Sequence, residues 1–324
     1  MEHPVYHLRP HKAVDRNLFI EALLRLGKIL PLSDYRYIGF GSYEFDEFKL
    51  VYRMLGIEDL HSIEMDSDIY IRQIFNKPYS CISLFNKTCG TYFDEDYEET
   101  KSSIIWTDFS VAKDKLSQCQ DISNICSKLR VNDLLRITFN AQPSSIPTGD
   151  MNGEEITSEN KSRRRFLWLK ENLGDYFPDE VSGDDLTTAK YPLFLLKLAY
   201  KAIYKDLDTN IVPCPICCYT YADNMQMMTI TILMCKTDNK TQMVEKLKQA
   251  FKGWDAYTRI DNWNEPINIS LPALTVHEQI EIAQYPKNSK AKATILKRLG
   301  IAEKDLENYW RFARYYPNYQ PITL

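Results

Sequence analysis

The segment 35–66 constrains the fold of this chain more than any other. It opens with Tyr35-Arg-Tyr-Ile-Gly-Phe-Gly-Ser42, continues with a helical pattern and ends with Leu60-His-Ser-Ile-Glu-Met-Asp66. This order of strand, glycine turn, helix, strand and acid is typical of the first βαβ unit of a nucleotide-binding α/β sheet. Gly39 and Gly41 are expected to let the backbone turn sharply and approach a ligand closely. The segment therefore predicts a ligand site at the end of its first strand, the alternative being an ordinary tight turn.

Two acidic residues narrow the choice of ligand. Glu64 lies at the end of the second strand of the unit, where a carboxylate can accept hydrogen bonds from both hydroxyls of a ribose. Glu44 stands where the dinucleotide fingerprint has its third glycine, and its negative charge would repel a pyrophosphate. NAD is therefore disfavoured. A ligand with a ribose and no phosphate fits better, and S-adenosylmethionine is the common compound of that kind.

Strand and helix patterns alternate along most of the chain. Helices are predicted over 14–30, 45–55, 68–75 and 192–204, with a further helix after the fourth strand, and strands over 35–39, 60–64, 80–85, 102–108, 134–139, 211–221 and 227–235. The last two strands are close enough in sequence to form an antiparallel hairpin. Five βα units closed by an antiparallel pair predict an α/β fold, a Rossmann-like seven-stranded methyltransferase sheet with helices on both faces.

Changes in pattern divide the chain into parts. We predict an N-terminal arm and helix over 1–34, a methyltransferase-like domain over 35–254 and a C-terminal helical appendage over 255–324. The polar stretch of about 142–190 reads as an insertion over the edge of the sheet. The appendage contains a capping box at Thr275, and its last helix is rich in aromatic residues. These aromatic residues predict a core or a surface for a protein partner or a second copy of the chain, rather than a base-stacking site.

Composition and charge limit the possible partners and locations. The formal net charge of −4 gives no general attraction to nucleic acid or to anionic lipid. A local cluster of Lys161, Arg163, Arg164 and Arg165 could bind phosphate, although a solvated loop is the simpler interpretation. With no hydrophobic leader and no apolar run of membrane-spanning length, we expect a cytoplasmic protein that does not enter a membrane.

Two other groups of side chains have the spacing of a functional motif, but their sequence context favours a structural interpretation. His3, His7 and His11 have the spacing of metal ligands on a helix, but Pro4 and Pro10 interrupt such a helix, so that an arm without metal is predicted. The run Cys214-Pro-Ile-Cys217-Cys218 resembles a redox motif but lies in a strand pattern, where residues three apart should point to opposite faces. Buried free cysteines and no metal site are predicted.

Four segments together resemble a family of bacterial O-methyltransferases with a Rossmann-like core. They are Leu8–Arg16, Tyr37–Ser42, His61–Asp66 and Ile104–Phe109. The resemblance spans roughly residues 5–240, and members of the family are sometimes thought to work beside defence genes. It implies that S-adenosylmethionine is the cofactor, with its methionine along Gly39, Phe40, Gly41 and Ser42, its ribose on Glu64 and its adenine near Asn86. Asp108 would face the substrate as a base or an orienting group.

Two positions depart from that family pattern. Most active methyltransferases of this class carry an acid two residues before the first glycine, where this chain has Tyr37, and Tyr43 replaces a small residue after Gly41. Arg9 and Lys12 are candidates for different contacts. Two functions stay open at this point, namely a methyltransferase of unknown acceptor, acting in a bacterial defence system by the resemblance, and a non-catalytic scaffold or nucleotide sensor. Asp108 has a second interpretation as the cap of the following helix.

Overall fold

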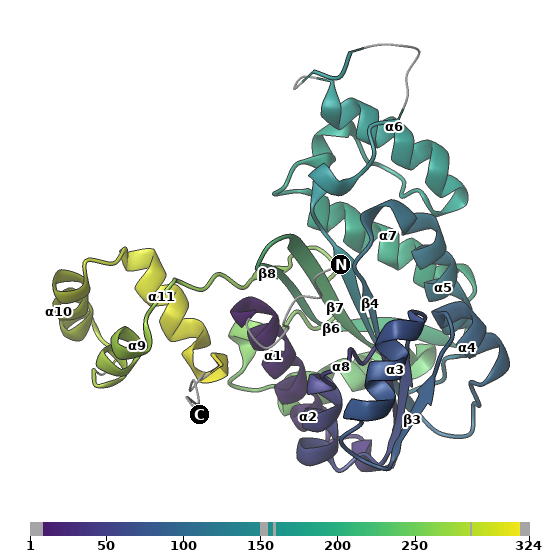
Figure 1. Ribbon diagram of the computed structural model, residues 1–324, viewed down its shortest axis with the longest axis horizontal. Coiled ribbons are helices and arrows are strands. Elements are labelled where there is room, and N and C mark those ends of the chain that lie inside the picture. Colours follow the sequence, from purple (N-terminus) through teal and green to yellow (C-terminus); the bar gives the residue numbers. More distant parts are fainter. Residues whose placement is uncertain (1–8, 150–154, 158–159, 286, 318–324) are drawn as a thin grey trace.

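The protein is built around one mixed sheet of eight strands (Figure 1). The computed structural model describes residues 9–149, 155–157, 160–285 and 287–317. The strand order is β3-β2-β1-β4-β5-β7-β6-β8. The bounds are β1 (Arg36–Gly39), β2 (Asp59–Ile63), β3 (Ile82–Phe85), β4 (Ser103–Phe109), β5 (Leu134–Asn140), β6 (Ile211–Ala222), β7 (Gln226–Lys236) and β8 (Ile267–Asn268).

The first seven strands confirm the predicted Rossmann-like methyltransferase sheet. β1 to β5 run parallel, and β7 inserts antiparallel between β5 and β6. The eighth strand is a difference from the prediction. β8 pairs in parallel with β6 through only two residues, too few to show an alternating pattern in the sequence.

Helices cover both faces of the sheet, as predicted. Their bounds are α1 (Pro10–Leu26), α2 (Asp46–Leu55), α3 (Ser67–Asn76), α4 (Cys89–Glu95), α5 (Lys115–Lys128), α6 (Lys161–Leu173), α7 (Tyr191–Lys205), α8 (Lys240–Ala250), α9 (Val276–Ala283), α10 (Ser289–Leu299) and α11 (Glu303–Phe312). One apolar core joins α1, α2 and α8 to the sheet, and the other joins α4, α5, α6 and α7 to its opposite face (Figure 1). The sequence patterns do not predict the short helix α4 or the helix α8.

Helix α1 begins earlier than predicted. Pro10 occupies its first turn, where a missing N–H costs nothing, so that this proline starts the helix rather than interrupting it. At its centre Asp15 is fully buried and its Oδ2 accepts a hydrogen bond from Arg136 Nη2 of β5 at 2.6 Å. The Arg136 guanidinium also lies over the rings of Phe19 and Trp106, each at 4.6 Å. These contacts fix α1 against the middle of the sheet.

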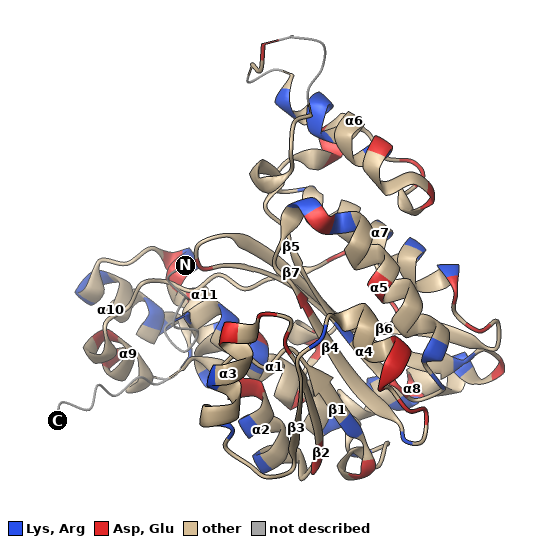
Figure 2. Cartoon of the chain, turned by 45° about the vertical axis from the view of Figure 1, so that its right-hand side comes forward, with Lys and Arg blue, Asp and Glu red and all other residues tan. Residues whose placement is uncertain are grey.

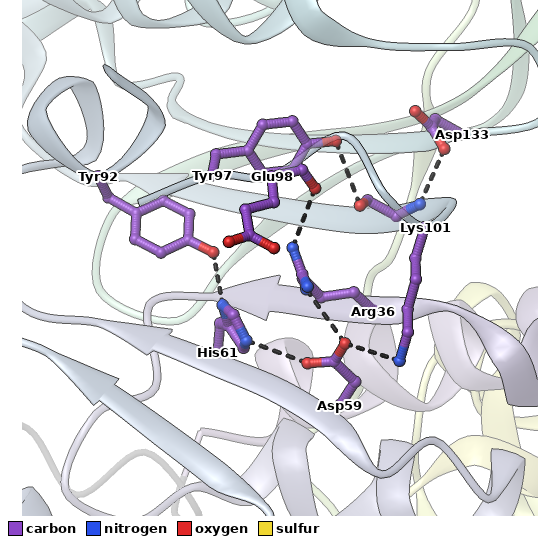
Figure 3. Close-up of polar contacts among 9 residues, drawn as sticks. Arg36, Asp59, His61, Tyr92, Tyr97, Glu98, Lys101 and Asp133 are labelled. Atoms are coloured by element: carbon purple, nitrogen blue, oxygen red, sulfur yellow. Dashed lines mark hydrogen bonds and ion pairs between the residues drawn. The ribbon is translucent and has the colours of Figure 1, made fainter. Parts of the chain in front are cut away.

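The amino-terminal ends of β1 and β2 carry a closed polar network (Figure 3). Asp59 is its centre, with Oδ2 3.2 Å from Arg36 Nε and 3.1 Å from Lys101 Nζ, and Oδ1 3.0 Å from His61 Nε2. His61 Nδ1 lies 2.6 Å from the Tyr92 hydroxyl. Although burial alone would raise the pKa of Asp59, these cationic neighbours lower it below its usual value. The network joins two strands to α4 at the edge of the sheet.

The stretch predicted as a polar insertion contains a helix. The basic cluster forms the first turns of α6 and lies at the top of the molecule, with Lys and Arg in blue (Figures 1 and 2). Arg164 is buried and donates to the carbonyls of Thr148 and Gly149, while Arg165 Nε donates to the carbonyl of Ile146. Two of the four cations therefore hold the preceding loop, which weakens the interpretation of this cluster as a nucleic-acid site.

The C-terminal helices stand apart from the sheet, and the short turn that follows α11 contacts α1 (Figure 1). The capping box at Thr275 opens α9 as predicted. Leu306 and Tyr309 of α11 form a small core with residues of α9 and α10. Phe312 and Tyr315 belong instead to the main core, where the Tyr315 hydroxyl accepts a hydrogen bond from the Trp254 ring at 2.5 Å. The aromatic residues thus join the appendage to the sheet.

The cysteine run in β6 is buried, as predicted, but its geometry differs. The pairing of β6 with β7 shifts between Pro215 and Cys217. This bulge places Cys214 and Cys217 in the same core, although three residues of regular strand would have separated them. Cys218 lies in the core of the opposite face. All three thiols are free and buried.

Candidate functional site

A cleft of about 580 Å³ opens at the carboxyl ends of β1, β2 and β4. We call it the main cleft, and its walls include Phe40, Ser42, Ile63, Glu64, Asp108 and Asp223. In open α/β sheets ligands bind at this edge, because the loops that follow parallel strands meet there. Its volume is that of a pocket for a nucleoside-sized molecule. The fold therefore places the predicted ligand turn at a cavity of suitable size.

The glycine turn approaches its neighbours closely without a left-handed bend. A β-carbon on Gly41 would stand 2.5 Å from Phe48 Cε2 and 2.8 Å from Ser62 Oγ, so that no side chain fits there. Neither Gly39 nor Gly41 adopts a positive φ, which corrects the expectation of a sharp glycine bend. Phe45 takes the left-handed conformation instead, with φ 52°, just before α2. Such a conformation is unusual for an aromatic residue and marks this loop as constrained.

Glu64 and Asn86 lie beside each other at the ends of β2 and β3. Glu64 lines the main cleft, and one of its carboxylate oxygens accepts a hydrogen bond from the Asp66 amide at 2.8 Å. Asp66, the acid just before the predicted helix 68–75, in turn caps α3. Asn86 is not among the residues that line the cleft; its side-chain amide donates to the Glu64 carbonyl at 2.8 Å. Asn86 therefore supports the loop that carries Glu64.

Asp108 faces the main cleft from β4 and forms an ion pair. Its Oδ2 lies 2.7 Å from Lys12 Nζ, while its Oδ1 is buried and has no hydrogen-bond partner among the described residues. The next α-helix begins only at Lys115, so the interpretation of Asp108 as a helix cap is wrong. Lys12 comes from the first turn of α1, 96 positions away in the chain. The cleft thus contains a carboxylate fixed by a distant lysine.

The turn between β6 and β7 holds the start of α1 over the cleft. Asp223 accepts hydrogen bonds from the backbone N–H of His11 and of Lys12, at 3.2 and 3.1 Å, and lies 2.9 Å from His11 Nδ1. These bonds satisfy two of the free amides of the helix start. His11 Nε2 accepts a hydrogen bond from the Leu271 amide at 3.2 Å. Sequence patterns gave no signal for this contact, because its partners lie far apart in the chain.

A small inner pocket of about 40 Å³ adjoins the main cleft, beneath the start of α1. Its walls include Lys12, Arg16, Tyr37, Ser42, Glu47 and Asp108, of which Lys12, Ser42 and Asp108 also line the main cleft. Burial raises the pKa of Tyr37 well above its usual value, and burial likewise raises the pKa of Glu47 against the opposing effect of Arg16. Glu47 could have been suspected from its place in the first turn after the glycine loop.

An open groove of about 580 Å³ lies beyond Asp108. We call it the basic groove, with Lys113, Asn140, Ser144, Ser145, Thr148 and Arg165 among its walls. It shares Ser110, Val111 and Met225 with the main cleft, so that the two are continuous. No acidic residue is found among the described residues that line the basic groove. The arrangement offers a positively charged approach to the edge of the sheet that carries Asp108.

Metal and membrane binding were also checked on the described residues. In this part of the chain no three His, Cys, Asp or Glu residues are grouped so as to hold a metal ion. His11 pairs with Asp223, and the other two histidines of the predicted arm, His3 and His7, lie outside the described residues. No helix among the described segments combines the length and apolar character needed to cross a bilayer.

Comparison with known proteins gives a family match over nearly the whole chain. A family model described as "Putative O-methyltransferase" matches residues 4–324, which extends the resemblance through the C-terminal helices. No curated protein matches the sequence.

Solved structures match only loosely. The O-methyltransferase TomG from Streptomyces achromogenes, in complex with SAM, is 10% identical over 68% of this chain and 80% of its own, with a TM-score of 0.38. An arsenic(III) S-adenosylmethionine methyltransferase from Chlamydomonas reinhardtii is 11% identical over 63% and 64%, also at 0.38. A fibrillarin complex is 10% identical over 44% and 61%, at 0.29. The chain spans less than two thirds of the length of the last two, and such alignments support no residue-level correspondence.

Proposed function

Because the chain belongs to the family described as "Putative O-methyltransferase", we propose that it transfers a methyl group from S-adenosylmethionine to an oxygen of an acceptor molecule. The observation that carries the proposal is the main cleft at the carboxyl ends of β1, β2 and β4, in a sheet whose first seven strands have the methyltransferase order. A role in bacterial defence stays a prediction of the family resemblance.

The residues present fit this cofactor in size and charge. Five acids and three cations line the main cleft, and this excess of acids suits a ligand that carries a positive sulfonium; the acids are Glu64, Asp108, Asp114, Asp121 and Asp223. We assign the ribose to the Glu64 carboxylate, which lines the main cleft at the end of β2. Gly39, Phe40, Gly41 and Ser42 are proposed to follow the methionine portion, and Asn86 to act near the adenine by holding the Glu64 loop.

The chemistry would depend mainly on alignment and on one proton transfer. When bound, S-adenosylmethionine supplies an electrophilic methyl group on its sulfonium sulfur. The acceptor oxygen must lie in line with that carbon, and its proton must leave as the new bond forms. We assign the proton to Asp108, whose buried Oδ1 has no hydrogen-bond partner in the described part of the chain, while Lys12 holds Oδ2 and fixes the carboxylate.

The basic groove suggests the class of acceptor. Lys113 and Arg165 line it without a neighbouring acid among the described lining residues, and it is continuous with the main cleft at Ser110. A hydroxyl compound with a carboxylate or a phosphate would be held there with its oxygen toward Asp108. Replacement of both cations, Lys113→Ala with Arg165→Met, is expected to raise KM for such an acceptor. Lys161→Ala, an exposed cation on α6, is the matched control.

The first test is calorimetric titration with S-adenosylmethionine and S-adenosylhomocysteine. We expect micromolar binding that is lost in Glu64→Ala and kept in Glu58→Ala, because Glu58 is an exposed acid outside the residues that line the cleft. Absence of binding at millimolar concentration would refute the proposal. Equal loss in both variants would show a general effect on the fold instead.

A second candidate function is a non-catalytic scaffold or nucleotide sensor. The observation in its favour is that Tyr37 stands where most active relatives carry an acid, while Lys12 neutralises Asp108. This candidate predicts a stoichiometric protein partner and function that survives in Asp108→Asn and Glu64→Ala. Loss of function in both variants would exclude it. The C-terminal helices are the proposed contact for such a partner or for a second copy of the chain.

A further inference from the structure

The inner pocket presents hydrogen-bonding groups that the protein itself leaves unused. The Tyr37 side chain is fully buried, and its hydroxyl has no hydrogen-bond partner among the described residues. The same is true of Asp108 Oδ1 and of Arg16 Nε. Buried polar atoms without a partner are rare in folded proteins, because each costs about 1–3 kcal/mol of lost hydration. Asp108 also lines the main cleft, where its Oδ1 is assigned to the acceptor, so the Tyr37 hydroxyl and Arg16 Nε are the two atoms that a ligand of the inner pocket would complete.

The Tyr37 hydroxyl lies at the glycine turn. It would be 3.0 Å from a β-carbon on Gly39, which places it directly over the backbone proposed to follow the methionine portion of the cofactor. Burial and the nearby Glu47 raise the pKa of this hydroxyl, so it is neutral at physiological pH. A phenol can hydrogen-bond to an ammonium group but cannot supply the negative charge of the acid that relatives carry at this position.

Glu47 supplies a negative charge from a different element. It lies in the first turn of α2 and lines the inner pocket, and its carboxylate accepts a hydrogen bond from the backbone N–H of Glu47 itself. The neighbouring Asp46 takes the ion pair with Arg16, its Oδ2 lying 2.9 Å from Arg16 Nη1. Glu47 is therefore left facing the pocket, with its charge favoured by Arg16 and Lys12.

The pocket combines charges of both signs in a small volume. About 40 Å³ is room for roughly three water molecules, which matches the few polar atoms of an amino-acid head group. Glu47 and the Tyr37 hydroxyl form an acceptor side, and Arg16 and Lys12 form a donor side. A zwitterion would contact both sides, whereas a simple cation or a simple anion would find groups of opposite charge on only one of them.

We propose that the inner pocket binds the α-amino and α-carboxylate groups of the cofactor's methionine portion, with Glu47 in place of the acid that is missing at position 37. Glu47 accepts from the ammonium group together with the Tyr37 hydroxyl, and Arg16 Nε donates to the carboxylate. This inference rests on the proposed function, and it makes Glu47 a determinant of which adenosine compounds bind.

Two ligands that differ only in the head group test this assignment by calorimetry. S-adenosylhomocysteine carries the amino-acid head, and 5′-methylthioadenosine lacks it. We expect Glu47→Gln to weaken the homocysteine compound at least about tenfold, through loss of a charged hydrogen bond, and to leave methylthioadenosine within about twofold. Glu58→Gln, the same change at an exposed position, should alter neither.

The outcomes separate this inference from the proposed function. Unchanged affinity of Glu47→Gln for S-adenosylhomocysteine would overturn the role of Glu47 and leave the methyltransferase proposal intact. An equal loss for both ligands would also overturn it, because the effect would not depend on the head group. If the wild-type protein binds neither ligand, both proposals fail together. Binding of free methionine alone would assign the pocket to an amino acid and refute its link to the cofactor.

A second variant and a pH series guard against a purely structural effect. Tyr37→Phe should weaken S-adenosylhomocysteine several-fold without lowering the melting temperature of the free protein, since the hydroxyl has no partner to lose. The charged and titratable groups around Glu47 are Arg16, Lys12, Asp46, Tyr37 and Asp108. Affinity for the head group should fall as acid protonates Glu47, and this fall should be absent in Glu47→Gln.

Discussion

Two groups of polar side chains, one at each end of the parallel strands, differ in whether their buried atoms have hydrogen-bond partners. At the amino-terminal end, Asp59 joins Arg36, His61 and Lys101 into a network in which no buried side-chain atom lacks a partner (Figure 3). At the carboxyl end, Tyr37 and Asp108 each keep a buried oxygen without one in the described part of the chain.

The difference between these two groups of side chains distinguishes residues that stabilise the fold from residues that bind a ligand. In a network whose polar groups all have partners, the hydrogen bonds and ion pairs offset the hydration free energy that the charges lose on burial. Such a network therefore stabilises the fold. Unsatisfied atoms beside a cavity cost stability in the free protein and are explained by a ligand. The presence of charged residues does not identify the site. Buried polar atoms without a hydrogen-bond partner beside a cavity do.

Replacement of Asp108 should have the largest effect on activity, and it changes only the site at the carboxyl end of the strands. For Asp108→Asn we expect methyl transfer to fall about 10²–10⁴-fold, the usual effect of losing a proton acceptor, with little change in cofactor affinity. Stability should change by less than about 1 kcal/mol, since the ion pair with Lys12 is partly exposed. Single-turnover kinetics and urea denaturation measure the two effects. Full activity of the variant would remove Asp108 from the chemistry.

Gly41→Ala tests whether close packing, rather than flexibility, explains the glycine turn. The new methyl group would stand 2.5 Å from Phe48, so we expect a loss of about 2–3 kcal/mol in stability together with loss of cofactor binding. Gly56→Ala is a useful contrast, because it has φ 68° with nothing near its side-chain position and should cost about 1 kcal/mol from backbone strain alone. Normal binding by Gly41→Ala would contradict the packing argument.

Asp59→Ala should disturb only the amino-terminal end. We expect a loss of about 2 kcal/mol in the free energy of unfolding, because Arg36 and His61 lose their shared acceptor, with cofactor affinity unchanged. The pKa of Asp59 is lowered in the folded state, so the difference from wild type should begin to shrink as the pH falls past the pKa of an unfolded aspartate and should vanish as it passes through the lower pKa of the folded state. Asp238→Ala, in an exposed ion pair, is the control in urea titrations. A loss of cofactor binding by Asp59→Ala would break the comparison.

Asp121→Asn should have the smallest effect and the opposite sign. Burial and the nearby Asp94 raise the pKa of Asp121, in the wall of the main cleft, to about 6. Its charge is therefore unfavourable in the folded protein at neutral pH, and we expect the variant to be more stable by about 1 kcal/mol, after allowance for its partial exposure. This gain should shrink as the pH falls from about 6 to about 4, where the folded wild type gains its proton first. Thermal melts across that range would show it.

The sequence predicted the parts of the fold that depend on local patterns. The strand order, the Asp66 cap and the Thr275 capping box follow from alternation, helical spacing and capping chemistry within a few residues. The patterns do not predict α4, α6 or β8, because these elements are short or polar and are shaped by tertiary contacts. The prolines of β6 are compatible with its bulge, because strands accept proline mainly at edges and bulges, but they do not fix where the pairing shifts.

Only part of the candidate site could be predicted from local sequence patterns. Glu64 and Asp108 can be predicted as site residues because each is an acid at the end of a predicted strand, the place where ligands of such sheets bind. The ion pair of Lys12 with Asp108, by contrast, joins residues 96 positions apart, and the bonds of His11 to Asp223 join residues 212 apart. Which side chains meet across such distances depends on the path of the whole chain. The partners that decide the chemistry were therefore visible only in the structure.

The hydrogen bonds of His11 have a consequence for synthesis of the protein on the ribosome. The start of α1 is held by Asp223 in the β6–β7 turn and by the Leu271 amide. During translation these two partners are made 212 and 260 residues after His11. The start of α1 is therefore fixed over the main cleft only late in synthesis. A nascent chain that has already formed β1 to β5 still lacks a complete binding site.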